Sequence, residues 1–290
     1  MKISISMEHP IRIDGATPEQ AAQMLKNAGF QGVDISMTFD MMDTEKVFSP
    51  EWRERILGRA AAAKAAGLEI AQCHLPYYPN HIPYPGAGCY EDFEAFMLPR
   101  YELGLSICAE IGCPVGVTHP YSNIASAADT HAGNLKMLEK LIPILEKYNL
   151  RLALENLWAK DYKWSHMSSA AEILSVVNEC GSPFVGACID TGHANIFSLN
   201  ISDMARTYGD RLFALHVNGN AGKDEHTIPY AMSGWCELID FNAFAKTLGE
   251  IGYKGFFNLE LSTGGLPKST AQPFLNFAGA VARCLADTAL

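Results

Sequence analysis

The sequence predicts an α/β protein in which residues 1–290 fold as a single (β/α)₈ TIM barrel. Short apolar runs, which are typical of buried strands, alternate eight times with longer segments of helical character. No linker or change of composition divides the chain, and eight such units in about 290 residues are what a closed barrel requires. The expected strands cover residues 2–7, 32–36, 68–74, 115–119, 151–155, 185–190, 212–217 and 255–260.

An open, doubly wound sheet is the rival architecture. Such sheets usually carry a glycine-rich, phosphate-binding turn after the first strand. Here the expected first strand leads into Met7-Glu8-His9-Pro10, which contains no glycine. The barrel is therefore favoured. Because Glu8 and His9 also interrupt the apolar stretch that follows Met1, we expect no signal peptide.

The expected helices have recognisable start and stop signals. Thr17 is a suitable N-cap, Pro18 occupies the first helical position, and Gly29 follows the helix as a stop. The pair Ser49-Pro50 repeats this start before the next helix. These signals fall between the expected strands, which is where a barrel places its helices.

Two more helices are expected in the middle of the chain, over residues 135–148 and 170–180, where apolar residues recur at helical spacing. Pro143 lies inside the first of them. Because proline has no backbone N–H and its ring clashes with the preceding turn, we expect Pro143 to kink or break this helix.

The composition is that of a protein with a large core, since 48% of the residues are hydrophobic and 19% are charged. No apolar run in the sequence approaches the roughly 18 residues needed to cross a membrane. Eight cysteines without a CxxC pair are typical of buried small side chains rather than of a disulfide framework. We therefore expect cytoplasmic localisation and no membrane partner.

The net charge is −10, from 22 basic and 32 acidic residues. A protein that follows a nucleic-acid backbone needs local positive charge to neutralise phosphates. Only a few basic side chains, among them Lys160, Lys163 and Lys223, fall in loops expected at the active face. We therefore expect no nucleic-acid partner, although an acidic chain can still carry a small basic groove.

The last four expected strands each end in a residue type that binds metals: Glu155, Asp190, His216 and Glu260. Burying a carboxylate or imidazole beside an apolar strand is costly unless the group is paired or metal-bound. Neighbouring strands lie about 4.8 Å apart, so side chains at four successive strand ends can converge on one cation. Three carboxylates and one imidazole suit Mn²⁺, Mg²⁺, Co²⁺ or Zn²⁺. We predict that these four residues bind a divalent metal at the barrel mouth.

Five further residues are candidates for additional metal or substrate contacts. Each histidine among them could equally be a hydrogen-bonded residue at a strand end, and the sequence leaves these alternatives open. They end the third and fourth expected strands, or lie in the loops that follow Asp190 and His216: His74, His119, His193, Asp224 and His226.

Five segments carry a resemblance to a known group of proteins: Glu155-Asn156, Asp190-Thr191-Gly192-His193, the stretch from His216 to His226, Ile239-Asp240-Phe241 and the terminal Glu260. Together they resemble the xylose-isomerase-like barrel superfamily, and the resemblance spans essentially the whole chain. This superfamily includes sugar and sugar-phosphate isomerases and epimerases, and also zinc-dependent apurinic/apyrimidinic endonucleases. Its motifs are specific for the superfamily but discriminate poorly among reactions.

The resemblance to the epimerase branch implies one divalent metal, most commonly Mn²⁺, held by the residues that match Glu155, Asp190, His216 and Glu260. No organic cofactor is expected. We predict a metal-dependent isomerase or epimerase of a sugar, sugar phosphate or related polyol. The metal would polarise a substrate carbonyl, and Glu155 and Glu260 would transfer a proton on opposite faces of the carbon through a metal-stabilised enediolate.

Other residues are expected to hold the carbohydrate. His193 would hydrogen-bond a substrate oxygen, and Lys223 would contact a distal hydroxyl or phosphate. Trp158 belongs to a group of loop aromatics that could form an apolar wall against the sugar or anchor their own loops: Tyr77, Tyr78, Trp158, Trp164 and Trp235. Members of the superfamily are often dimers or tetramers, so a homo-oligomer is also compatible.

Two alternative enzymes remain. The endonuclease branch uses three zinc ions, and the sequence offers a match for each ligand class: His74, His119, Glu155, Asp190, His193, His216, Asp224, His226 and Glu260. The chain departs from that branch in its acidic charge and in a loop after His216 that looks shorter. A multi-zinc phosphodiester hydrolase is therefore one alternative, and a metal-dependent dehydratase of a cyclic polyol is the other.

Overall fold

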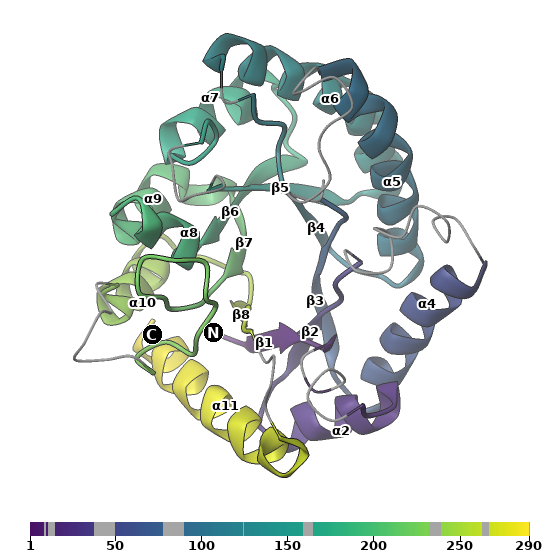
Figure 1. The fold of residues 1–290 in the computed structure, drawn as a ribbon, viewed down its shortest axis with the longest axis vertical. Coiled ribbons are helices and arrows are strands. Elements are labelled where there is room, and N and C mark those ends of the chain that lie inside the picture. The colour runs from purple at the N-terminus through teal and green to yellow at the C-terminus, as the bar shows by residue number, and fades with distance from the viewer. Residues whose placement is uncertain are drawn as a thin grey trace.

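Parallel β-strands form the centre of the molecule, and helices surround them (Figure 1). The computed structural model describes residues 1–8, 10, 15–37, 50–77, 90–123, 125–158, 165–231, 239–262 and 267–289. Within these residues one eight-stranded sheet has the order β7-β6-β5-β4-β3-β2-β1-β8. Its strands are β1 (Ile3–Ser6), β2 (Gly32–Asp34), β3 (Glu69–His74), β4 (Val115–Thr118), β5 (Arg151–Glu155), β6 (Val185–Asp190), β7 (Leu212–His216) and β8 (Phe257–Leu259).

The two ends of this sheet meet and close the barrel. Val217, directly after β7, pairs in parallel with Leu259 of β8. The Val217 N–H donates to the Asn258 carbonyl at 2.8 Å, and the Glu260 N–H donates to the Val217 carbonyl at 3.1 Å. The strand pairs within the sheet are all parallel, so the carboxyl ends of the strands share one mouth. The predicted fold class, a single (β/α)₈ barrel, is confirmed.

The described helices are α2 (Pro18–Asn27), α4 (Pro50–Ala65), α5 (Tyr90–Glu110), α6 (Ala127–Tyr148), α7 (Ala170–Glu179), α8 (Thr191–Ile196), α9 (Ile201–Tyr208), α10 (Phe241–Glu250) and α11 (Ala271–Thr288), with 3₁₀ turns η2 (Gly209–Arg211) and η3 (Lys268–Thr270). The C-terminal helix α11 packs against both α10 and α2 and so completes the outer ring (Figure 1). In the described part of the chain, no helix combines the length and apolar character needed to span a bilayer.

The start of α2 follows the predicted signals. The Thr17 hydroxyl accepts a hydrogen bond from the Gln20 N–H at 3.3 Å, and the Gln20 side chain accepts one from the Thr17 N–H at 3.0 Å. This reciprocal pair is a capping box, which satisfies two N–H groups at the helix end. Gly29 has a φ of 87°, the left-handed conformation that ends helices at glycine.

Of the two outcomes predicted for Pro143, a kink or a break, the break does not occur, because α6 continues through the proline. The helix begins already at Ala127, where Ser126 accepts a hydrogen bond from the Asp129 N–H at 3.1 Å, and it continues past the proline. Pro143 is exposed, whereas Leu141 and Leu145 on either side are buried. Packing of this buried face stabilises the helix enough to offset the one backbone hydrogen bond that Pro143 removes.

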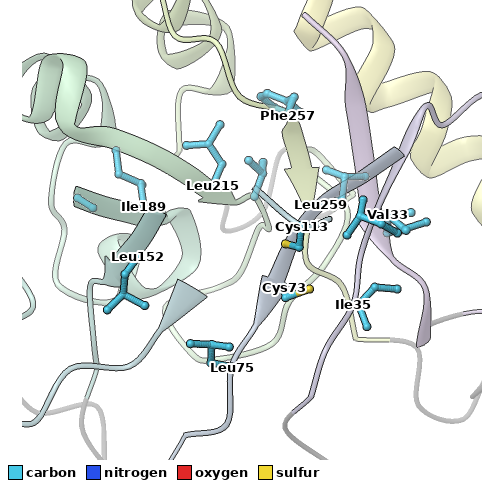
Figure 2. Packing of buried hydrophobic residues seen from close by; sticks show 14 of the residues in the cluster. Val33, Ile35, Cys73, Leu75, Cys113, Leu152, Ile189, Leu215, Phe257 and Leu259 are labelled. Carbon is cyan, nitrogen blue, oxygen red and sulfur yellow. The ribbon is translucent and has the colours of Figure 1, made fainter. Parts of the chain in front are cut away.

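The main hydrophobic core joins the sheet to the surrounding helices. Figure 2 shows part of it, with Leu152 of β5, Ile189 of β6 and Leu215 of β7 among the packed side chains. Residues of β4, β5, β6 and β7 form a second, smaller cluster: Val115, Val117, Ala153, Cys188, Phe213 and Ala214. Of these, Ala153 and Cys188 directly adjoin Leu152 and Ile189 along their strands and so face the opposite side of the sheet. Two packed layers therefore fix the strands whose ends build the site.

The described cysteines are free thiols, and four of them, Cys73, Cys108, Cys113 and Cys188, are buried as expected for small core side chains. The sulfur atoms of the first three lie within 4.8 Å of one another. Cys89 and Cys236 lie outside the described residues.

Candidate metal centre

The structure brings the four predicted metal ligands together at the barrel mouth. Glu155, Asp190 and His216 are the last residues of β5, β6 and β7, and Glu260 follows β8. One ligand atom of each lies within 4.8 Å of those of the other three. The side chains of Glu155, Asp190 and His216 are at most 1% exposed, while that of Glu260 is 24% exposed and faces the mouth.

Glu155 lies at the centre of this group. Its Oε2 is 3.1 Å from His216 Nδ1 and 3.5 Å from both His74 Nε2 and His119 Nε2. Its Oε1 is 3.3 Å from His193 Nδ1. Side chains at or just after the ends of β3, β4, β6 and β7 therefore surround one carboxylate.

Several atoms that face one another here make no hydrogen bond within the described part of the chain: Glu155 Oε2, Glu260 Oε2 and His216 Nδ1. His216 Nδ1 lies 3.4 Å from Glu260 Oε2 as well as 3.1 Å from Glu155 Oε2. Buried carboxylate oxygens without partners are costly, and a divalent cation between them would satisfy all three atoms. The donor set of carboxylates and imidazole fits such an ion.

The surroundings shift the pKa values of the two glutamates in opposite directions. Burial alone would raise the pKa of Glu155, but the neighbouring His216 and His119 hold it well below its ordinary value. Burial raises the pKa of Glu260, against the opposite effects of His216 and His226 and with a further rise from Glu155. Environments that push two carboxyl pKa values apart are typical of an acid–base pair.

A second group of candidate ligands extends from this centre toward the loop after β7. Asp190, His193 and His226 each have a ligand atom within 4.8 Å of the other two. His226 Nε2 hydrogen-bonds Asp224 Oδ1 at 2.6 Å, and the same oxygen is 3.6 Å from His193 Nε2. Burial lowers the pKa of His226, but Glu260 and Asp224 raise it overall to about 10.

A third group contains His74, His119 and Glu155. The rings of His74 and His119 lie 5.2 Å apart, and Tyr77 stacks on His119 at 4.5 Å. A further group, His74, His216 and Glu260, links the third group to the four predicted ligands. All nine residues that match the three-zinc pattern therefore lie around one mouth.

The turn after β6 has a local explanation. Asp190 is the N-cap of α8, and its Oδ1 accepts a hydrogen bond from the His193 N–H at 2.7 Å. The Thr191 hydroxyl donates to the Asn218 carbonyl at 2.6 Å and accepts from the Asn218 N–H at 2.9 Å. A Cβ at Gly192 would lie 2.0 Å from Asn218 Oδ1, so any larger residue would have to displace the Asn218 side chain. The Asp-Thr-Gly-His motif thus locks the end of β6 to the loop after β7.

Several polar residues that were not predicted from the sequence hold the proposed ligands. Asn218 donates through Nδ2 to Asp190 Oδ2 at 2.9 Å. Asn156 accepts from the Asp190 N–H at 2.8 Å and accepts through its carbonyl from His193 Nδ1 at 2.8 Å. Asp34, at the end of β2, is buried beneath the mouth. The available signal was a polar residue within or directly after an apolar strand, which also marks Asp34.

The predicted substrate contacts fall at different distances from the centre. The Trp158 ring lies 6.2 Å from that of His193 and is half-buried, so both border the same part of the mouth. Lys223 is exposed in the loop that carries Asp224. Three of the predicted aromatics lie outside the described residues: Tyr78, Trp164 and Trp235.

A family model described as xylose isomerase-like TIM barrel matches residues 22–276. The chain therefore belongs to this family, as the sequence motifs predicted. It is 30% identical over 122 residues to a D-psicose 3-epimerase of Enterocloster bolteae, which is 42% of this chain and 36% of that protein. It is 24% identical over 139 residues to an inosose isomerase of Bacillus licheniformis, 46% of this chain and 48% of that protein.

These matched segments span less than half the length of either relative. Likeness in three dimensions is more extensive. A crystal structure of a D-psicose 3-epimerase in the presence of D-fructose superposes with a TM-score of 0.72 and 17% identity, and the match covers 99% of each chain. At this level of identity the superposition shows a shared fold.

Proposed function

We propose that this protein is a divalent-metal-dependent isomerase or epimerase of a sugar, sugar phosphate or related polyol. The observation that carries the proposal is the pair of carboxylate oxygens, Glu155 Oε2 and Glu260 Oε2, which lie 3.1 Å and 3.4 Å from His216 Nδ1 without hydrogen bonds of their own among the described residues. The relatives named as sugar epimerase and inosose isomerase support the same reaction class and a carbohydrate substrate.

Glu155, Asp190, His216 and Glu260 would hold the cation, with Mn²⁺ the first choice and Zn²⁺, Co²⁺ or Mg²⁺ as alternatives. A bound cation would supply polarisation of the substrate carbonyl, which makes the neighbouring C–H more acidic. Glu155, whose pKa is lowered, would accept that proton. Glu260, whose pKa is raised, would return a proton to the opposite face of the carbon. The two roles would exchange in the reverse reaction.

His193 and Trp158 would orient the sugar. His193 Nδ1 donates to the Asn156 carbonyl at 2.8 Å, which leaves Nε2 facing the loop of Asp224. Burial lowers the pKa of His193, but Asp190, Asp224 and Glu155 raise it overall to about 9. A ring protonated at both nitrogens would donate from Nε2 to a substrate oxygen. Trp158 would cover the apolar face of the sugar beside it.

The test is turnover of D-psicose, D-fructose and an inosose in D₂O with Mn²⁺, followed by NMR and mass spectrometry of the product. The wild type should yield an isomer of one of these substrates with a single carbon-bound deuterium. Glu155→Gln and Glu260→Gln should each abolish turnover, because an amide can still contact the ion but cannot accept a proton. Glu250→Gln, at an exposed carboxylate that ends α10, is the matched control and should retain activity.

Absence of turnover by the metal-loaded wild type across the panel would contradict the proposal for these substrates. An unlabelled product together with active glutamate variants would contradict the proton-transfer roles. A product that is lighter than its substrate by one water molecule would indicate the dehydratase instead.

A multi-metal phosphodiester hydrolase is the second candidate, because the structure gathers further groups of possible ligands around the same mouth. Metal analysis of the purified protein separates the two functions. About one ion per chain supports the isomerase, whereas about three ions per chain support the hydrolase.

The remaining expectations stay predictions from the sequence. They are cytoplasmic localisation, the absence of a nucleic-acid partner, and an oligomeric state that the superfamily makes plausible without fixing it.

A further inference from the structure

Asp34 is a buried carboxylate beneath the proposed metal centre, and nothing in the acid–base mechanism uses it. It ends β2 and is 3% exposed. Its Oδ2 accepts hydrogen bonds from Gln72 Nε2 at 3.0 Å and from Asn258 Nδ2 at 3.4 Å, and its Oδ1 accepts one from the His74 N–H at 3.2 Å. All of these partners are donors, so Asp34 acts as an acceptor on each side.

His216 presents its second ring nitrogen to this carboxylate. Nε2 lies 3.7 Å from Asp34 Oδ2, is fully buried and makes no hydrogen bond in the described part of the chain. Nδ1, on the other side of the ring, faces Glu155 and Glu260. The two nitrogens of one imidazole therefore lie between carboxylates in opposite directions.

With the proposed cation bound beside Nδ1, the two neutral tautomers of His216 are unequal. A proton on Nδ1 would point at Glu155 and leave the Nε2 lone pair facing the Asp34 carboxylate, which is repulsive. A proton on Nε2 would point at Asp34 and direct the Nδ1 lone pair toward the oxygens of Glu155 and Glu260, where the cation is proposed. Histidine ligands commonly donate their second N–H to a carboxylate in this way, which fixes the tautomer and the ring orientation.

We propose that Asp34 is the positioning residue of the metal centre, which accepts the Nε2–H of His216 and thereby presents Nδ1 to the cation. This inference rests on the proposed metal-dependent function. The separation needs to shorten by only about 0.8 Å to reach a normal N–H···O distance. The same carboxylate also holds His74 through its backbone N–H, and the His74 ring stacks on the His216 ring at 5.2 Å and 14°. Asp34 thus restrains the His216 ring directly at Nε2, and indirectly through the His74 ring that stacks on it.

The experiment compares Mn²⁺ binding by calorimetry in the wild type, Asp34→Asn and Ser4→Ala, with circular dichroism to verify folding. Asp34→Asn should weaken Mn²⁺ binding roughly 10–100-fold, which is the usual effect of losing such a partner. Ser4→Ala is the matched control. The Ser4 hydroxyl donates to Asn258 Oδ1 at 2.8 Å, so this variant disturbs the same buried network without touching His216 and should bind Mn²⁺ as the wild type does.

A second measurement needs no variant at Asp34. In ¹⁵N-histidine NMR of the zinc-loaded wild type, with His216→Gln used for assignment, His216 should show a protonated Nε2 and a metal-bound Nδ1. A metal-bound Nε2, or unchanged Mn²⁺ affinity in folded Asp34→Asn, would overturn the role of Asp34 alone. A wild type that binds neither Mn²⁺ nor Zn²⁺ would overturn the metal centre and this inference with it.

Discussion

Replacing Gly192 by alanine tests how the structure couples the turn after β6 to the metal centre. The new Cβ would lie 2.0 Å from Asn218 Oδ1 and 2.7 Å from Asn220 Nδ2, both far below a normal contact. Asn218 is the residue most affected, and its Nδ2 holds Asp190 Oδ2 at 2.9 Å. Relief of the clash must therefore move the side chain that orients a proposed ligand.

Two effects set the size of the change. Overpacking a buried site by one methyl group typically costs about 1–3 kcal/mol of unfolding free energy. Loss of the hydrogen bond from Asn218 to Asp190 should lower metal affinity by roughly 10–100-fold, as for other residues that orient a ligand. We therefore expect Gly192→Ala to remain folded, to melt at a lower temperature and to bind Mn²⁺ weakly.

The assay combines thermal unfolding with Mn²⁺ titration calorimetry. Gly58→Ala is the matched control, because Gly58 is exposed within α4 and a Cβ there would meet nothing within 4 Å. This control should be neutral or more stable by up to about 1 kcal/mol, since alanine favours helix more than glycine does. A double variant adds Asn218→Ala. If the clash with Asn218 is the cause, Gly192→Ala should weaken Mn²⁺ binding little further in that background. Wild-type Mn²⁺ affinity in Gly192→Ala alone would refute the reasoning.

Three further predictions follow from the site. Asp190→Asn and His216→Gln should each lower Mn²⁺ affinity sharply while circular dichroism stays unchanged, because ligands at the mouth add little to the core; full metal occupancy in both would contradict the ligand set. Burial lowers the pKa of His216, but Cys188, Glu260 and Glu155 raise it overall well above its ordinary value, so the ion must displace a proton. Mn²⁺ affinity should then rise by up to about tenfold per pH unit between about pH 6 and 8. The metal-free protein should lose the stability that protonated His216 contributes as pH rises above about 6.5. A pH-independent Mn²⁺ affinity would contradict proton displacement from His216. Because the net charge is −10 and the outer-helix residues Arg53 and Lys140 are paired with Glu110 and Glu94, zinc-loaded protein should not nick abasic duplex DNA; nicking that Glu260→Gln abolishes would favour the hydrolase.

Much of the architecture could be predicted from sequence because strand and helix signals repeat eight times and each signal is local. The positions of Glu155, Asp190 and His216 at strand ends were predictable for the same reason, since a barrel brings all its carboxyl ends to one mouth. The continuity of α6 past Pro143 was not predictable, because it depends on tertiary packing that no local sequence signal reports. Nor was the role proposed for Asp34, although it also ends a strand.

The role proposed for Asp34 could not be predicted because it depends on the register of the strands, which local sequence signals do not give. Along β6 and β7, Ala187 pairs with Leu212, but an irregularity after Ala187 shifts the pairing so that Asp190 lies opposite His216. Without that shift Asp190 would lie opposite Leu215, and the two proposed ligands Asp190 and His216 would not face each other across the strand pair. A similar irregularity after Val33 places Asp34 opposite Gln72, the partner that donates to it. A shift of one residue moves a side chain to the other face of a strand, so these two irregularities decide whether the proposed ligands converge at the mouth and whether Asp34 lies against His216.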